Sequence, residues 1–196
     1  MKELKISTAQ FENKSGNKEY NLSVIDTLAG QAASEGSDAI AFHECSVTGY
    51  TFAGKLTREE LSDVAELIPE GESTSRLINT AARYGIVILA GLFEKDITGK
   101  IYKAYVCVGK DGLIAKHRKL HPFIHPDITP GDQFTVFDLK GWKCGILICY
   151  DNNVVENVRA TALLGAQIIF MPHVTMCTPS PRPGAGFVYT GLWKNR

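Results

Sequence analysis

The sequence predicts an α/β protein in which helices pack against layered β-sheets. Apolar stretches that suit strands alternate along the chain with stretches whose apolar residues recur at helical spacing. Gly-rich and polar clusters separate these stretches, as expected for turns between compact elements. The chain has 196 residues, 44% of them hydrophobic, which is enough for a sizeable core. We therefore expect a single domain over residues 1–196.

The expected strands are short runs of alternating or uniformly apolar residues, several of them rich in β-branched side chains. In chain order they are residues 4–11, 39–42, 86–93, 101–108, 113–116, 134–137, 144–148 and 167–171. Lys110-Asp111-Gly112 predicts a hairpin turn, and Gly141-Trp142 predicts a turn into the strand at 144–148. Residues 117–132 contain three prolines and are expected to form a loop.

The expected helices are stretches in which apolar residues recur at helical spacing between polar breaks. They are residues 18–33, 57–65, 74–84 and a stretch from Val154 to Gly165. Gly85 and Gly165 stand where helices commonly end. In the last helix the apolar residues 154, 155, 158 and 162 recur at helical spacing.

Cys149 lies at a sharp turn between the strand at 144–148 and the last helix. Asp151, Asn152 and Asn153 are candidates for the N-cap of that helix, and Glu156 follows Asn153 at close to the capping-box spacing. A thiol at this place would face the positive end of the helix, which favours thiolate. This predicts a nucleophile. The alternative is a small buried hydrophobic residue, the commonest fate of a free cysteine.

Two further polar residues stand at comparable places. Glu44 follows the apolar strand at 39–42, and the carboxyl ends of strands commonly carry catalytic groups in open α/β sheets. The alternative for Glu44 is a capping or ion-pairing carboxylate. Lys119 follows Lys116, His117 and Arg118, so it is alternatively part of a solvated basic face. The residues alone do not distinguish Lys119 from Arg118.

Three motifs, taken in order, resemble the signatures of the nitrilase, or carbon–nitrogen hydrolase, superfamily. They are Glu-x-x-x-x-Gly-Tyr from Glu44, Arg-Lys-x-His around Lys119 and Cys-Tyr-Asp from Cys149. The resemblance implies a four-layer α-β-β-α sandwich. It also implies that Cys149 is the nucleophile, Glu44 the general base and acid, and Lys119 the oxyanion donor, assisted by the backbone N–H of Tyr150.

The chain departs from the superfamily pattern in three respects. His43 stands where a proline commonly precedes the first glutamate, and no second glutamate lies between Lys119 and Pro130-Gly131. Only Asp127 is available there to take over a supporting role. Members of the superfamily also continue well beyond the end of this chain. We therefore expect a sandwich that is incomplete at its C-terminus, with a loop at 179–186 and a further element opening at 191–196.

The resemblance implies hydrolysis of a non-peptide carbon–nitrogen bond in a small amide or carbamoyl compound through a Cys149 acyl-enzyme, releasing ammonia or amine. Two alternatives are nitrile hydrolysis through a thioimidate, and a catalytically inactive binding or scaffold protein. The expected substrate-binding residues each lie near a motif and are Tyr50, Tyr150, Asn153 and His173. A homodimer or higher homo-oligomer is also implied.

Composition bounds the remaining classes. The 21 basic and 21 acidic residues balance, so neither a nucleic-acid partner nor a membrane surface is expected. The five cysteines are an odd number without regular spacing, which argues against a disulfide framework and favours the cytoplasm. The sequence has no Cys-x-x-Cys pair, which argues against structural zinc. Core or near-site thiols are expected at Cys45, Cys107, Cys144 and Cys177. Prolines 122 and 126 argue against a helix that would align His117, His121 and His125, so no metal site is expected there. No cofactor is expected either.

Overall fold

The computed structural model describes residues 3–174 with their side chains and the backbone of residues 187–194. The strands are β1 (Glu3–Gln10), β2 (Ala39–Phe42), β3 (Val87–Lys95), β4 (Ile101–Gly109), β5 (Gly112–Arg118), β6 (Thr135–Leu139), β7 (Trp142–Ile146), β8 (Ile168–Phe170) and β9 (Phe187–Lys194). The α-helices are α1 (Lys18–Ser34), α2 (Arg58–Val64), α3 (Glu72–Tyr84) and α4 (Val155–Leu163). Two 3₁₀ helices, η1 (Thr51–Lys55) and η2 (Cys149–Asn153), follow β2 and β7.

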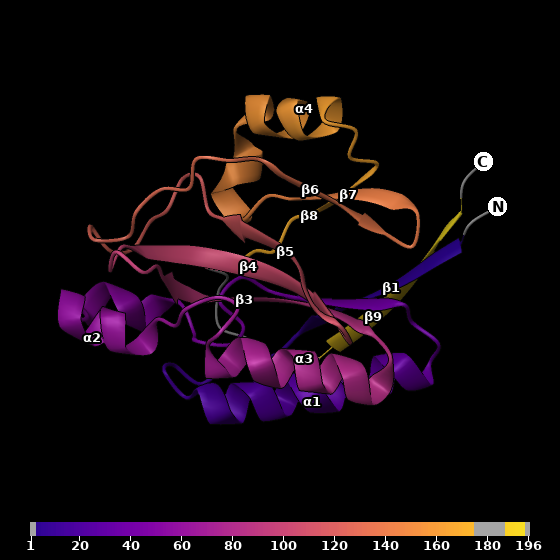
Figure 1. Cartoon of the computed structure of the whole chain (residues 1–196), viewed down its shortest axis with the longest axis horizontal. Helices are drawn as coiled ribbons and strands as arrows, with labels where there is room; N and C mark the ends of the chain where they lie inside the picture. Colours follow the sequence, from indigo (N-terminus) through magenta and orange to yellow (C-terminus); the bar gives the residue numbers. More distant parts are fainter. Residues whose placement is uncertain (1–2, 175–186, 195–196) are drawn as a thin grey trace.

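These elements form four layers (Figure 1). Helices α1 and α3 cover one face of a sheet with the strand order β5-β4-β3-β2-β1-β9. The opposite face of this sheet packs on a smaller sheet with the order β6-β7-β8, and α4 lies beyond it. The α-β-β-α sandwich implied by the resemblance is therefore confirmed.

Strand direction brings the polar ends of two strands to the same region of the sandwich. In the larger sheet β1, β2 and β3 are parallel neighbours, whereas β3, β4 and β5 are antiparallel. In the smaller sheet β7 is antiparallel to β6 and parallel to β8. The chain leaves β2 toward Glu44 and leaves β7 toward Cys149, each at a carboxyl end.

Two apolar layers hold the sandwich together. The outer layer lies between the helices and the larger sheet, where Ile25, Leu77 and Ile88 are each at most 1% exposed. The inner layer lies between the two sheets and includes Leu4 and Ile146, both fully buried. Burying a side chain of this size contributes about 1.5–3 kcal/mol, so the two layers account for most of the favourable energy of folding.

Most predicted boundaries agree with the structure to within a few residues, and three differ instructively. Helix α3 begins at Glu72, two residues before the predicted start. Strand β8 comprises only Ile168–Phe170. Trp142, expected in a turn, is the first residue of β7, because Lys140 and Gly141 take the positive φ angles of the turn instead.

The predicted last helix is present as α4, but its buried face is polar. Val155 is 69% exposed, and the side chains that α4 buries belong to Asn157 and Thr161. A Cβ added at Gly145 of β7 would lie 2.4 Å from Thr161 Cγ2. Helix and sheet therefore approach so closely that only small or slender side chains fit between them, and the larger apolar residues point outward.

The predicted cap of α4 is wrong. The turn η2 intervenes after β7, and Val154 is the N-cap without any side-chain hydrogen bond. Cys177 and the expected loop at 179–186 lie outside the described residues. The element expected from residue 191 falls within β9, which pairs antiparallel with β1.

Candidate active site

Glu44 lies in the loop that follows β2 and is 1% exposed. The loop is fixed on β3: the Val47 N–H donates to the Gly91 carbonyl, and the Gly91 N–H donates to Ser46 Oγ. A Cβ at Gly91 would lie 2.4 Å from the Cys45 backbone nitrogen, so only glycine permits this approach. The close contact holds the Glu44 carboxylate in the interior.

Lys119 directly follows β5 and is 1% exposed, so the alternative of a solvated basic face is wrong. Its Nζ donates to Glu44 Oε1 at 2.6 Å. Its backbone carbonyl accepts from the Gly131 N–H at 2.8 Å, which ties the Pro130-Gly131 turn to the lysine. Arg118, which the sequence could not separate from Lys119, has a different partner in the structure. It forms a bidentate ion pair with Glu94 and does not contact Glu44.

Cys149 is the first residue of η2, has a φ of 52°, and is partly exposed. Burial and the negative charge of Glu44 raise the pKa of its thiol, whereas Lys119 and the Tyr150 N–H oppose that rise. The expectation that a helix N-terminus favours thiolate is therefore wrong, since α4 begins only at Val155. The resting group is a thiol hydrogen-bonded to Glu44, so Glu44 is placed to accept its proton.

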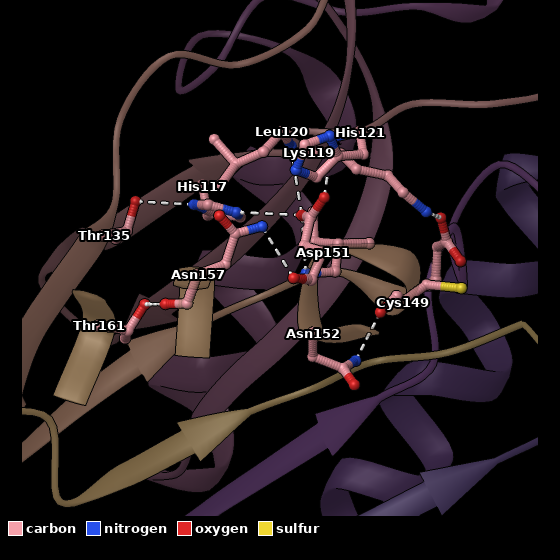
Figure 2. Close-up of polar contacts among 12 residues, drawn as sticks. His117, Lys119, Leu120, His121, Thr135, Cys149, Asp151, Asn152, Asn157 and Thr161 are labelled. Carbon is pink, nitrogen blue, oxygen red and sulfur yellow. Dashed lines mark hydrogen bonds and ion pairs between the residues drawn. The ribbon is translucent and has the colours of Figure 1, made fainter. Parts of the chain in front are cut away.

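Asp151 connects the turn at Cys149 with the loop at Lys119 (Figure 2). Its fully buried carboxylate accepts from the backbone N–H groups of His121 at 2.8 Å, Ile148 at 3.1 Å and Leu120 at 3.2 Å. His117 Nε2 lies 3.5 Å from Asp151 Oδ2. Asp151 was a candidate helix cap, but these donors turn its carboxylate into the interior instead.

Asn152 lies beneath Cys149 (Figure 2). Its Nδ2 donates to the Cys149 carbonyl at 2.5 Å and lies 2.8 Å from His173 Nε2. The loop after β8 is thereby tied to the turn that carries the thiol. The sequence marked Asn152 only as a possible cap, and nothing in its spacing indicates this role.

The four predicted substrate-binding residues have different surroundings. Tyr50 and His173 line a common cavity of about 160 Å³, together with His43 and Val174. Tyr150 is 44% exposed and packs edge-on against Phe123, with ring centroids 4.9 Å apart. Asn153 is exposed at the end of η2. The structure therefore places Tyr50 and His173 together and Asn153 apart from them.

Asp127, the candidate for the missing supporting carboxylate, does not support Lys119 in the described structure. Asp127 lies on the surface, 3.5 Å from Arg58 and 3.7 Å from His125, and makes no contact with Lys119. A residue that the sequence analysis missed lies beside Glu44 instead. Lys103 of β4 is 1% exposed, and its Nζ is 3.9 Å from Glu44 Oε1. A lysine within an otherwise apolar strand was the available signal.

The histidines of the loop after β5 serve separate contacts. His117 faces Asp151 and Thr135, whereas His125 hydrogen-bonds the Leu56 carbonyl at 3.0 Å. Among residues 3–174 and the backbone of 187–194, no cluster of His, Cys, Asp or Glu is arranged to hold a metal ion. No helix in that part of the chain is long and apolar enough to cross a membrane.

Cys149 is predicted to react with iodoacetamide faster than the other four cysteines. Cys45, Cys107 and Cys144 are buried, and burial raises the pKa of Cys45 to about 12 and that of Cys144 to about 11. The rate at Cys149 should rise with pH and reach its midpoint above the usual thiol pKa of about 8.5. Glu44→Gln removes one cause of the raised pKa and should lower that midpoint. Peptide mapping after brief labelling measures the rates, and equal labelling of several cysteines would contradict the prediction.

Fold and site together define the class: a nitrilase-type α-β-β-α sandwich with a buried Glu–Lys pair next to a cysteine. The carbon-nitrogen hydrolase family model matches residues 5–186. The chain belongs to the carbon–nitrogen hydrolase family.

Individual relatives agree with this assignment. The chain is 36% identical over 182 residues to a nitrilase from Pyrococcus abyssi, covering 91% of this chain and 68% of the relative. It is 32% identical over 193 residues to an omega-amidase from Xenopus tropicalis, covering 92% of this chain and 67% of the relative.

Solved structures show the same fold. Nit3 from Saccharomyces cerevisiae, a member of branch 10 of the nitrilase superfamily, superimposes with a TM-score of 0.75 at 27% identity, over 87% of this chain and 64% of that one. An amidase from Nesterenkonia sp. gives a TM-score of 0.72 at 23% identity, over 86% of this chain and 64% of that one. The chain thus spans about two thirds of the length of these relatives.

Proposed function

We propose that this protein hydrolyses the carbon–nitrogen bond of a small, non-peptide amide through a Cys149 acyl-enzyme. The observation that carries the proposal is the buried Lys119–Glu44 pair, with Nζ and Oε1 2.6 Å apart, hydrogen-bonded to a partly exposed thiol. The Glu44 carboxylate can serve as a general base, the Cys149 thiol as a nucleophile and the Lys119 ammonium as a cation that stabilises negative charge. All three groups are within contact distance of one another through Glu44.

In the proposed acylation, Cys149 Sγ attacks the amide carbon while Glu44 accepts the thiol proton. The developing oxyanion receives hydrogen bonds from Lys119 Nζ and from the Tyr150 N–H, which already lies beside the Cys149 sulfur. Protonated Glu44 then gives its proton to the departing nitrogen, and ammonia or amine leaves. In the second half-reaction Glu44 takes a proton from water, which attacks the thioester and releases the acid and the free thiol.

Amide hydrolysis is favoured over nitrile hydrolysis because the names of the relatives include an omega-amidase and an (R)-stereoselective amidase. Nitrile hydrolysis is the second candidate, because one relative is a nitrilase from Pyrococcus abyssi. There the same thiolate would add to the nitrile carbon and form a thioimidate. The third candidate, an inactive scaffold, has less support because the described site retains all three groups.

The decisive experiment measures ammonia release from a panel of short amides, carbamoyl compounds and nitriles, with Cys149→Ala as the blank. We expect turnover of at least one amide at a rate above the blank. Release from nitriles only would favour the second candidate. Equal release by both proteins, with every compound, would overturn the proposed activity.

The proposal includes a homo-oligomer. In α4, Val155 is 69% exposed and the last residue, Leu163, is 77% exposed; Leu164, just beyond the helix, is 54% exposed. Apolar side chains gathered on one exposed element are typical of a protein–protein contact. The free state of the described cysteines further supports the cytoplasm as the compartment.

The oligomer is predicted to depend on this face. Leu163→Glu should lower the mass measured by light scattering at micromolar protein to that of the 21.5 kDa monomer. Ile97→Glu is a matched control, because Ile97 is 94% exposed on a turn away from α4. A wild-type protein that is already monomeric would contradict the prediction.

A further inference from the structure

Lys103 is a buried cation without a hydrogen-bond acceptor. It is the third residue of β4, a strand in which every residue from Ile101 to Gly109 is buried. Its Nζ lies 3.9 Å from Glu44 Oε1 and 4.0 Å from the centroid of the Tyr50 ring. Among the described residues no atom accepts a hydrogen bond from it. A buried ammonium normally makes such bonds, so this group has three unused donors beside the proposed base.

Burial without an acceptor is unfavourable for the charged amine. It lowers the pKa of Lys103 to about 8, against the opposing attraction of Cys45, Glu44 and Cys149. A methionine has a similar length and would pack in the same apolar strand without this cost. The lysine is therefore not explained by the packing of β4, and its position points to the Glu44 carboxylate.

Lys119 faces two demands that conflict. In the resting structure its Nζ donates to Glu44 at 2.6 Å, yet in the proposed reaction it must donate to the oxyanion. Of the two lysines, only Lys119 is within hydrogen-bond distance of Glu44. When Lys119 turns toward the substrate, the buried Glu44 carboxylate would therefore lose this hydrogen bond, which is costly. The donors that then remain to Glu44 are the Cys149 thiol, whose proton it accepts in the proposed reaction, and the Val174 N–H, at 3.3 Å from Oε2.

We propose that Lys103 is a positioning residue that holds the Glu44 carboxylate while Lys119 serves the oxyanion. Its Nζ is 3.9 Å from the same oxygen that Lys119 contacts, so a small movement brings it within hydrogen-bond distance. Hydrogen bonds of this kind are often long in the unliganded state and shorten with substrate bound. The inference rests on the proposed amide hydrolysis and gives that reaction a second lysine.

The groups that face Lys103 are few. Glu44 and Cys45 come from the loop after β2, Tyr50 from the end of that loop, Lys119 from the chain after β5 and Cys149 from η2. Glu44 is the only carboxylate among them. Because a cation near a carboxylate favours its ionised form, removing Lys103 should make Glu44 easier to protonate.

The test compares Lys103→Met with Lys103→Arg, using whichever amide the wild-type protein hydrolyses. Lys103→Met is expected to lower kcat by about 10–100-fold with KM within about threefold. The acid limb of kcat/KM should move to higher pH, since Glu44 must be ionised to accept the thiol proton. Lys103→Arg keeps the charge and should keep the acid limb near its wild-type position. A merely structural lysine would not move this limb.

Wild-type kcat and an unshifted acid limb in Lys103→Met would overturn the inference. Thermal unfolding serves as the folding control, and Lys103→Met should be about as stable as the wild type because it removes a buried charge that makes no hydrogen bond in the described structure. If the wild-type protein itself hydrolyses no compound, the proposed function fails separately. The Glu44 titration midpoint, followed by carbon-13 NMR and assigned with Glu44→Gln, then decides: a higher midpoint in Lys103→Met supports the inference, and an unchanged midpoint overturns it.

Discussion

Cys149→Ala is expected to abolish ammonia release from the best amide substrate, and Glu44→Gln and Lys119→Ala should be nearly as damaging. In the proposed reaction the three groups act on one proton and one developing charge, so removing any of them should lose most of their joint effect. A loss of about 10³-fold or more is expected for each. The double variant Cys149→Ala with Glu44→Gln should be scarcely worse than Cys149→Ala alone. Steady-state ammonia release measures all four proteins.

Two matched controls separate chemistry from damage to the fold. Lys116 also lies at the end of β5, but it pairs with Glu94 rather than Glu44, so Lys116→Ala should keep nearly full activity. Cys144 lies buried between the sheets, so Cys144→Ala should affect stability rather than turnover. Wild-type ammonia release from Glu44→Gln would remove Glu44 from the mechanism.

The fold was predictable because its strands are marked by local patterns. The run from Val87 to Phe93 is almost wholly apolar, which predicts a strand that is covered on both faces. In the structure this run lies in β3 and is buried almost throughout. Gly85 ends α3 in the left-handed region, as the sequence indicates. The arrangement of the two sheets came only from the family resemblance, because the pairing of distant strands leaves no local pattern.

The polar interior of the site was less predictable. Asp151 resembles a helix cap in sequence, yet its partners are N–H groups about thirty positions away, in the loop after Lys119. In the sequence, Lys103 has the position of a solvent-facing residue in an alternating strand, but β4 is covered on both faces. In both cases the role depends on a neighbour brought close by the fold, which a local pattern does not encode.

The predicted helix N-terminus beside Cys149 failed in a similar way, whereas the assignment of Cys149 as the nucleophile stays a prediction. A helix was expected to begin near the thiol, and the structure inserts η2 there, so the positive end of α4 lies several residues further along. The thiol environment is consequently set by burial and by Glu44. The proposed mechanism accordingly activates Cys149 by proton transfer to Glu44, rather than by a standing thiolate.

Asp151→Asn is predicted to lower the free energy of unfolding by about 3–5 kcal/mol, a large part of the stability of a typical domain. The substitution removes the charge that three backbone N–H groups converge on and turns an amide donor toward some of them. Asp127→Asn is the matched control. Asp127 is a partly exposed carboxylate 3.5 Å from Arg58, so its loss should cost about 0–1 kcal/mol. Urea unfolding monitored by tryptophan fluorescence measures both variants.

The pH dependence of stability gives the same prediction a second test. Burial by itself would raise the pKa of Asp151, but hydrogen bonds from His117 and from the backbone N–H groups of His121, Ile148 and Leu120 outweigh it and lower that pKa. The charge of Asp151 therefore stabilises the folded state above the usual aspartate pKa of 3.8, and this contribution is lost as pH falls through the lower, folded-state value. Asp151→Asn should consequently lose less stability than the wild type between pH 5 and the acid transition. Parallel pH profiles for the two proteins, or equal stability at pH 7, would show that this buried carboxylate does not hold the Cys149 turn to the Lys119 loop.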